Sequence, residues 1–171
     1  MFEAHEDSDA IYYTQELIDG KNVAEMAAFG EKLEEEELLD VVKSAAQAFK
    51  YLYDSEMTFL PIWPEHVNVC DDGATRIANT VTVPTDDNHV PQATQIKNLA
   101  KCLHPLMDDS TKVNETIPNL LYSMTGAADD SETVDTWSGL LDEVKYIENQ
   151  WVEMAGGITP RKAAILSLIH I

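Results

Sequence analysis

Three histidines, His66, His89 and His104, are the first side chains in this sequence that suggest a metal site. Two histidines that bind one metal ion from the same helix are typically four residues apart, as in the His-Glu-x-x-His pattern. No two histidines in this chain have that spacing. We therefore expect no metal site, with His89 in a loop and His104 on the exposed edge of a helix.

The two cysteines, Cys70 and Cys102, give no sign of a chemical role. They form neither a Cys-x-x-Cys pair nor a zinc cluster, and two cysteines are too few for a disulfide framework. An unpaired cysteine usually packs as a small apolar side chain. The sequence therefore predicts two buried free thiols.

The chain is strongly acidic, with 11 basic and 31 acidic residues among 171 and a formal net charge of −20. A surface of this charge repels the phosphates of nucleic acids and of anionic lipids. The hydrophobic fraction of 44% is nevertheless that of a globular protein, and the length suits one domain. We expect one folded domain that does not bind nucleic acid.

Residues 1–7 are acidic and lack an apolar run, which argues against a signal peptide and favours a cytoplasmic protein. The apolar run at residues 163–171 is far shorter than the roughly 20 residues that cross a bilayer, so we expect no membrane insertion. Residues 155–171 are expected to form a tail. Within it, residues 166–171 read like the translation of a transposon end used to fragment DNA for sequencing, so we expect them to be foreign to the natural protein.

Hydrophobic periodicity predicts an α+β fold that is mostly helical. Apolar residues follow a helical stripe in residues 34–54, and acidic residues in its first turn complement the helix dipole. Short alternating segments flank Asp72-Gly73, which is typical of a β-hairpin. The other expected elements are a strand at residues 10–18 that runs into a turn at Asp19-Gly20, a loop at 80–91, a helix capped by Thr94 and ended by Pro105, and helices at 117–124 and 137–151.

The order of these elements and two short segments resemble the C-terminal lobe of protein kinases, in particular the bacterial serine/threonine kinases. Residues 12–22 are similar to the strand and hinge that hold adenine, and residues 63–69 (Trp-Pro-Glu-His-Val-Asn-Val) resemble the family's Lys-Pro-Glu-Asn-Ile-Leu-Val. The resemblance implies a remnant of the N-lobe and the hinge entry over residues 1–18, and a C-lobe with a small hairpin over residues 19–154. It would also give adenine-hinge positions to Gln15, Glu16 and Ile18.

The same alignment implies that the residues of phosphate transfer are replaced. The catalytic aspartate becomes Pro61, the phosphate-steadying lysine becomes Trp63, the magnesium-binding asparagine becomes His66, and Asp-Phe-Gly begins at Asn79. Phosphate transfer needs a carboxylate near the substrate hydroxyl and magnesium bound by carboxylate oxygens. The resemblance therefore implies no catalytic residues and no metal, and it leaves ATP binding open. The aspartate of the family's anchoring helix is Gln95.

Three functions stay open at this point. The favoured one is an inactive kinase-like module, a pseudokinase, that binds an unidentified protein partner, with the Trp63 indole obstructing the nucleotide cleft. The second is a divergent active kinase that binds ATP and takes its carboxylate from Asp71, Asp72 or Asp86. The third is a fragment with no function of its own.

Overall fold

The computed structural model describes residues 18–57, 60–78, 90–109, 115–126 and 133–154, together with the backbone of residues 3–7 and 10–14. Its longest element is helix α2 (Glu35–Asp54), in close agreement with the predicted span. The backbone N–H of Glu34 donates to the carboxylate of Glu37 at 2.9 Å, which fixes the first turn. One face of α2 is buried, at Leu38, Leu39, Val41, Val42, Ala45, Ala46 and Phe49.

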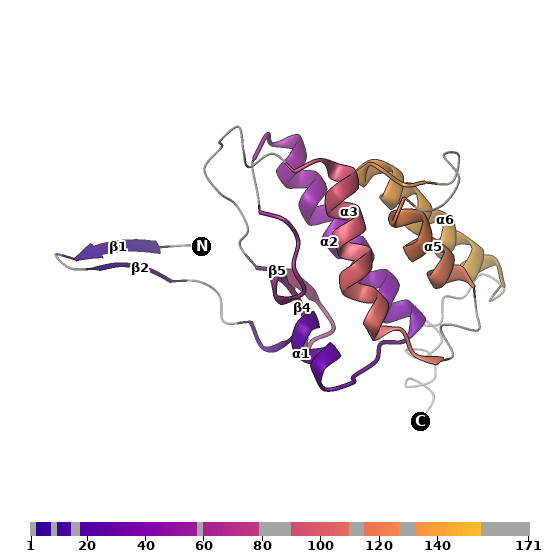
Figure 1. Ribbon diagram of the computed structural model, residues 1–171, viewed down its shortest axis with the longest axis horizontal. Helices are drawn as coiled ribbons and strands as arrows, with labels where there is room; N and C mark the ends of the chain where they lie inside the picture. Colours follow the sequence, from indigo (N-terminus) through magenta and orange to yellow (C-terminus); the bar gives the residue numbers. More distant parts are fainter. Residues whose placement is uncertain are drawn as a thin grey trace, which may run out of the picture.

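Three more helices form one bundle with α2, as Figure 1 shows: α5 (Thr116–Met124) and α6 (Trp137–Met154) contact α2, and α3 (Gln92–Leu103) contacts α5. Two contacts join α2 to α6: the rings of Phe49 and Trp137 stack with their centroids 5.3 Å apart, and the Lys43 ammonium lies 2.6 Å from the Glu148 carboxylate. Because both rings are fully buried, this stack lies in the centre of the core.

The prediction for α3 is partly wrong and partly confirmed. The helix begins at Gln92, behind Pro91, instead of after a Thr94 cap. It ends at Leu103 and tightens into the short 3₁₀ helix η3 (His104–Leu106). Pro105 ends the α-helix as predicted, because proline lacks the N–H that the next turn would need.

A three-stranded antiparallel sheet lies beside the helices, in the order β3-β4-β5. Strands β4 (Val67–Cys70) and β5 (Thr75–Ile77) form the predicted hairpin. The third strand, β3 (Gly20–Asn22), begins at Gly20, where the sequence predicts a turn at Asp19-Gly20. Gly20 has φ of +147°, and a Cβ there would lie 2.3 Å from the carbonyl oxygen of Val69, so β3 can approach β4 only because this residue is glycine.

Helix α1 (Val23–Ala28) follows β3 directly. Its start is fixed by Asn22, whose side-chain oxygen accepts from the Glu25 N–H at 2.9 Å, while the Asn22 N–H donates to the Glu25 carboxylate at 3.0 Å. The preceding strands β1 (Glu3–Asp7) and β2 (Ala10–Thr14) form a separate antiparallel hairpin. The strand predicted at residues 10–18 therefore corresponds to β2 as far as Thr14.

The fold is α+β and mostly helical, with a small antiparallel sheet, as predicted. Both cysteines are buried free thiols, and His104 is exposed, also as predicted. Among the described helices, none combines the length and the apolar character needed to cross a membrane. His89, most of the loop predicted at 80–91, and the tail at 155–171 lie outside the described residues.

Candidate functional site

The candidate site is built on the loop Leu60–Trp63 and the 3₁₀ helix η1 (Pro64–His66) that follows it. Gln95 of α3 fixes the backbone of this loop with two hydrogen bonds. Its side-chain oxygen accepts from the Ile62 N–H at 2.8 Å, and its side-chain nitrogen donates to the Leu60 carbonyl at 3.2 Å. Because Gln95 is fully buried, its amide oxygen and nitrogen need hydrogen-bond partners within the protein, and the loop backbone supplies both. Ile62, which is 2% exposed, adds an apolar anchor.

The anchored loop presents apolar side chains to solvent. Trp63 is 57% exposed and Leu60 is 44% exposed. The backbone N–H of Trp63 donates to Nδ1 of His66 at 3.3 Å, which links two of the positions expected to be replaced kinase residues. Pro61 stands between them in the sequence and is partly buried. The structure thus links Trp63 to His66, with the indole largely in solvent, and Pro61 belongs to the same loop.

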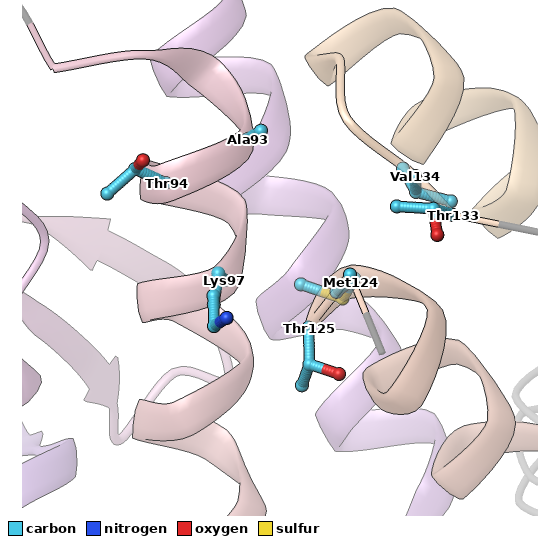
Figure 2. Close-up of a pocket in the computed structure, with 8 residues that line it drawn as sticks. Ala93, Thr94, Lys97, Met124, Thr125, Thr133 and Val134 are labelled. Atoms are coloured by element: carbon cyan, nitrogen blue, oxygen red, sulfur yellow. The ribbon is translucent and has the colours of Figure 1, made fainter. Parts of the chain in front are cut away.

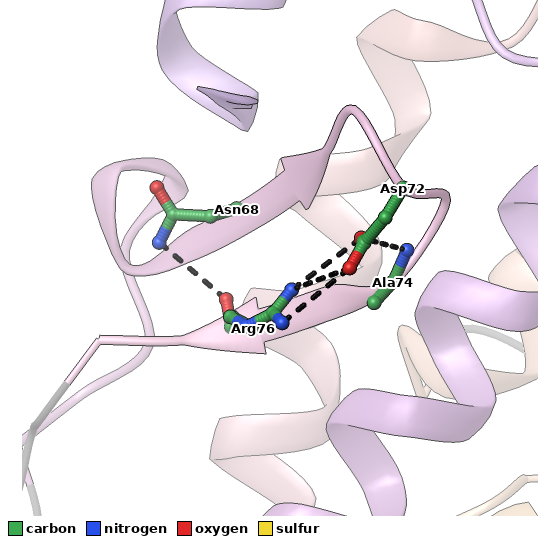
Figure 3. Close-up of polar contacts among 4 residues, drawn as sticks. All are labelled: Asn68, Asp72, Ala74 and Arg76. Atoms are coloured by element: carbon green, nitrogen blue, oxygen red, sulfur yellow. Dashed lines mark hydrogen bonds and ion pairs between the residues drawn. The ribbon is translucent and has the colours of Figure 1, made fainter. Parts of the chain in front are cut away.

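The hairpin β4-β5 follows this loop, and hydrogen bonds and an ion pair from its side chains stabilise it (Figure 3). The amide of Asn68 donates to the carbonyls of His66 and Arg76, each at 3.4 Å. In the turn, the Asp72 carboxylate accepts from the Ala74 N–H at 2.9 Å and pairs with the Arg76 guanidinium at 3.4 Å. The Ala74 N–H, followed by Arg76, holds the pKa of Asp72 below its ordinary value. The Asp72 carboxylate therefore already has its partners within the hairpin.

Residues 18–20, where the resemblance would place part of a hinge, lie at the turn end of the same sheet. Gly20 pairs with Cys70 in the register of β3 and β4, and the Asp71 N–H donates to the Asp19 carbonyl at 3.2 Å. Ile18 is partly buried and immediately precedes this pairing. It is therefore near the turn, whereas Trp63 and His66 lie at the other end of β4. The remaining predicted positions, Gln15, Glu16 and Asn79, lie outside the described residues.

The acidic residues of the hairpin are distant from the loop. Asp71 and Asp72 follow β4, while His66 precedes it, and four strand residues separate the two ends. At about 3.3 Å per residue, the five steps from His66 to Asp71 span roughly 16 Å. In the part of the chain that the structure describes, no three side chains of His, Cys, Asp or Glu gather closely enough to hold a metal ion.

Sequence reasoning missed the roles of Asn68 and Arg76. A signal for Arg76 was present, because an arginine four residues after the first acid of an Asp-Gly turn can reach back to that carboxylate across the hairpin. The bonds of Asn68 had no such signal, because they join it to backbone carbonyls whose position depends on the strand register.

No protein-family model matches this sequence, and a search of curated proteins also finds no match. The kinase-like interpretation accordingly remains a prediction from the order of the elements and the short segments quoted above.

Proposed function

We propose that this chain is a catalytically inactive, protein-kinase-like module of the cytoplasm that binds a protein partner through the loop Leu60–His66. One observation carries the proposal: a buried side chain, Gln95, holds a loop that has a proline in place of the catalytic base and displays Trp63 to solvent. Exposed tryptophan on a rigid support is typical of the residues that dominate binding energy at protein interfaces.

The position of Gln95 supports the kinase-like part of the proposal. In the resemblance it takes the place of the aspartate of the anchoring helix, and it bonds to the backbone of the segment that takes the place of the catalytic loop. The order of α1, α2, the hairpin and α3 is also the order that the resemblance implies. Both observations are consistent with the fold of a C-lobe, and neither is specific to it.

The proposed lack of catalysis rests on the chemistry of the loop. Phosphate transfer needs a carboxylate that orients the hydroxyl to be phosphorylated, and the position where the resemblance expects it holds Pro61. The carboxylate of the loop, Glu65, stands where the family's Lys-Pro-Glu-Asn segment also has a glutamate, so it does not replace the base.

The divergent-kinase alternative would take its carboxylate from Asp71, Asp72 or Asp86. Asp71 and Asp72 lie at the other end of β4 from the loop, and Asp72 bonds to Ala74 and Arg76. Asp86 lies outside the described residues. We therefore favour the inactive module over the divergent kinase.

The charge of the chain restricts the partner. The net charge of −20 disfavours nucleic acid and favours a protein with basic residues around its contact surface. Glu65 is exposed next to Trp63, so the matching surface would combine an apolar pocket for the indole with a basic rim.

The first experiment tests catalysis with the full chain, magnesium and γ-labelled ATP. We expect no transfer of label to the chain or to an added acceptor protein, and no rise in melting temperature with MgATP, since Trp63 and His66 stand where the resemblance expects the phosphate-steadying lysine and the magnesium-binding asparagine. Transfer that disappears in an Asp71→Asn, Asp72→Asn or Asp86→Asn variant would instead establish the divergent kinase.

The second experiment tests partner binding with matched variants of the full chain as bait in extracts of the source cells. Trp63→Ala removes the proposed contact, and Tyr146→Ala removes an aromatic side chain of similar exposure, 59%, from α6. A protein retained by the wild type and by Tyr146→Ala but lost by Trp63→Ala supports the proposal. Equal retention by both variants contradicts it.

A further inference from the structure

Exposed apolar side chains are concentrated in one stretch of the chain, at the end of α2 and in the loop that follows it. Among the described residues, nine large apolar side chains are exposed, and five of them fall between positions 51 and 63. Tyr51 lies on another side of α2 from Tyr53, because two residues turn a helix by about 200°. The other four, which we call the apolar patch, are Tyr53, Met57, Leu60 and Trp63, with exposed fractions of 43%, 42%, 44% and 57%. Such a concentration is typical of an interaction surface, whereas single exposed apolar residues are normal for any folded protein.

Two backbone hydrogen bonds fold the chain back on the last turn of α2. The Glu56 N–H donates to the Tyr53 carbonyl at 3.0 Å, and the Met57 N–H donates to the Leu52 carbonyl at 2.9 Å. Glu56 has φ of +54°, a conformation that glycine or asparagine usually supplies at this position after a helix. A glutamate adopts it at an energetic cost, and strained residues of this kind concentrate at functional sites.

The rest of the apolar patch lies on the loop that Gln95 anchors. Three residues separate Met57 from Leu60, and three separate Leu60 from Trp63. A fully extended chain spans at most about 3.6 Å per residue, so Met57 and Trp63 lie within about 22 Å of each other. This is the length of a short extended peptide segment.

The charged side chains along the apolar patch are acidic. Glu56 and Glu65 are exposed, and residues 51–65 contain no lysine or arginine. Lys50, which precedes this stretch, pairs with Asp54. Residues 58–59 and 79–89, which lie outside the described ranges, also contain no lysine or arginine, so their positions do not change the sign of this charge.

The lysines of the neighbouring elements do not neutralise it. Lys97 and Lys101 follow Gln95 by two and six residues, about 200° and 240° around α3, so they lie on a different side of that helix from the loop. Figure 2 shows Lys97 on the side of α3 that faces Met124 and Thr125 at the end of α5. On β3, which contacts η1, the single lysine pairs with Glu31.

We propose that the apolar patch binds a short basic segment of another protein, whose apolar side chains contact Met57 and Trp63 and whose lysine or arginine side chains pair with Glu56 and Glu65. This inference rests on the proposed function and extends the contact from the loop to the end of α2. Charge decides between occupants, because a second copy of this chain, with its net charge of −20, would bring like charges together.

The test is a selection from a phage-displayed library of random dodecapeptides, with the full chain as the immobilised target. We expect the retained peptides to combine lysine or arginine with at least two large apolar residues. Binding of the synthesised peptides should weaken as sodium chloride is raised from about 0.05 M to about 0.5 M, because salt screens exposed charges. Retained peptides that lack basic residues, or a selection that retains none, would overturn the proposal.

Apolar variants locate the binding surface. Met57→Ala and Trp63→Ala should each weaken peptide binding about tenfold or more, as is typical of residues at the centre of an interface. Tyr51→Ala removes an aromatic side chain that is 67% exposed on another side of α2, and it should bind as the wild type does. Equal effects of Tyr51→Ala and Met57→Ala would contradict the proposal.

Charge variants separate the apolar patch from the general attraction of an acidic protein for basic peptides. Glu56→Asn removes the carboxylate and supplies a residue that tolerates positive φ. We expect it to weaken binding while the melting temperature stays the same or rises, a combination that loss of structure would not produce. Glu143→Gln makes the same charge change at an exposed position of α6, and equal weakening by both variants would show general attraction alone.

The outcomes distinguish this inference from the proposed function. Peptides that depend on Trp63 but not on Met57 or Glu56 would contradict the inference and leave the proposed function in place, whereas peptides that depend on none of them contradict both. A dimer seen by light scattering that Trp63→Ala abolishes would identify a second copy as the occupant. Peptide binding that appears only in the double variant Arg161→Gln, Lys162→Gln would identify the chain's own tail. Either result would overturn the inference.

Discussion

Gln95 shows why a neutral amide suits a buried position that must bind backbone. Its side chain offers both an acceptor for the Ile62 N–H and a donor for the Leu60 carbonyl. A carboxylate at the same place would lack the donor and would need its charge compensated in the core. The replacement of the expected aspartate by glutamine is therefore compatible with an ordered loop.

The Gln95→Ala variant tests this role. It would leave the Ile62 N–H and the Leu60 carbonyl without their partner, and we expect the free energy of unfolding to fall by about 2–4 kcal/mol. Urea denaturation measures the change. Gln150→Ala, which removes an exposed hydrogen bond to Tyr146, is the control and should change stability by less than about 0.5 kcal/mol. Similar effects of the two variants would argue against the anchor.

Cys102 makes stability depend on alkaline pH. Burial, with a smaller contribution from the charge of Glu65, raises the pKa of this thiol to about 11 from its ordinary value of 9.0. Between these two values the unfolded chain loses the proton while the folded chain keeps it. Since the unfolded state then binds fewer protons, stability falls as the pH rises through this window.

The Cys102→Ala variant isolates that effect from the other groups that titrate in the same range. We expect the wild type to lose more stability than Cys102→Ala between pH 8 and about pH 10.5, as measured by urea denaturation at each pH. Parallel curves for the two proteins would show that the thiol does not titrate differently on folding.

At the scale of elements, the sheet depends on a close approach between β3 and β4. The carbonyl oxygen of Val69 occupies the space that any Cβ at position 20 would need. Strand β3 leads directly into α1 through the Asn22 cap, so a displacement of β3 would also displace that helix. Glycine at position 20 therefore allows β3 to pair with β4 of the hairpin.

The Gly20→Ala variant should lower the free energy of unfolding by roughly 3 kcal/mol or more, because it adds both backbone strain and a steric clash. Gly30→Ala is the matched control: Gly30 also has positive φ, +68°, but has open space around it. That substitution should cost about 1 kcal/mol from backbone strain alone. Equal losses, measured by urea denaturation, would mean that the approach of β3 to β4 is not limiting.

At the scale of the whole molecule, electrostatic repulsion opposes folding. The ion pairs of the described residues are partly exposed, with side chains at least 33% accessible, and pairs of this kind contribute little. The net charge of −20 is concentrated when the chain becomes compact. Repulsion should therefore outweigh what these ion pairs add to stability.

Raising the sodium chloride concentration from about 0.01 M to about 0.1 M shortens the Debye length from about 30 Å to about 10 Å. We expect the melting temperature of the full chain to rise over this interval, because repulsion between distant carboxylates is screened. Potassium chloride at equal concentration is the control for ion-specific effects and should act in the same way. A fall in melting temperature would show that the exposed ion pairs dominate.

The sequence by itself determined the elements whose cause is local. The apolar stripe and acidic start of α2, the Asp72-Gly73 turn and the end of α3 before Pro105 each depend on residues within a few positions of one another. The number and spacing of the cysteines predicted that Cys70 and Cys102 are buried free thiols, which the structure confirms. The assignment of Pro61, Trp63 and His66 to one candidate loop came from the resemblance alone.

Only the tertiary structure decided features that join distant parts of the chain. Gly20 looks like a turn residue in isolation, and it becomes part of a strand because β4, almost 50 residues later, pairs with it. The hydrogen bonds of Gln95 to the loop likewise require segments that the sequence does not place together. Local propensity specifies how a segment can fold, whereas its partners are fixed by the burial of the whole core.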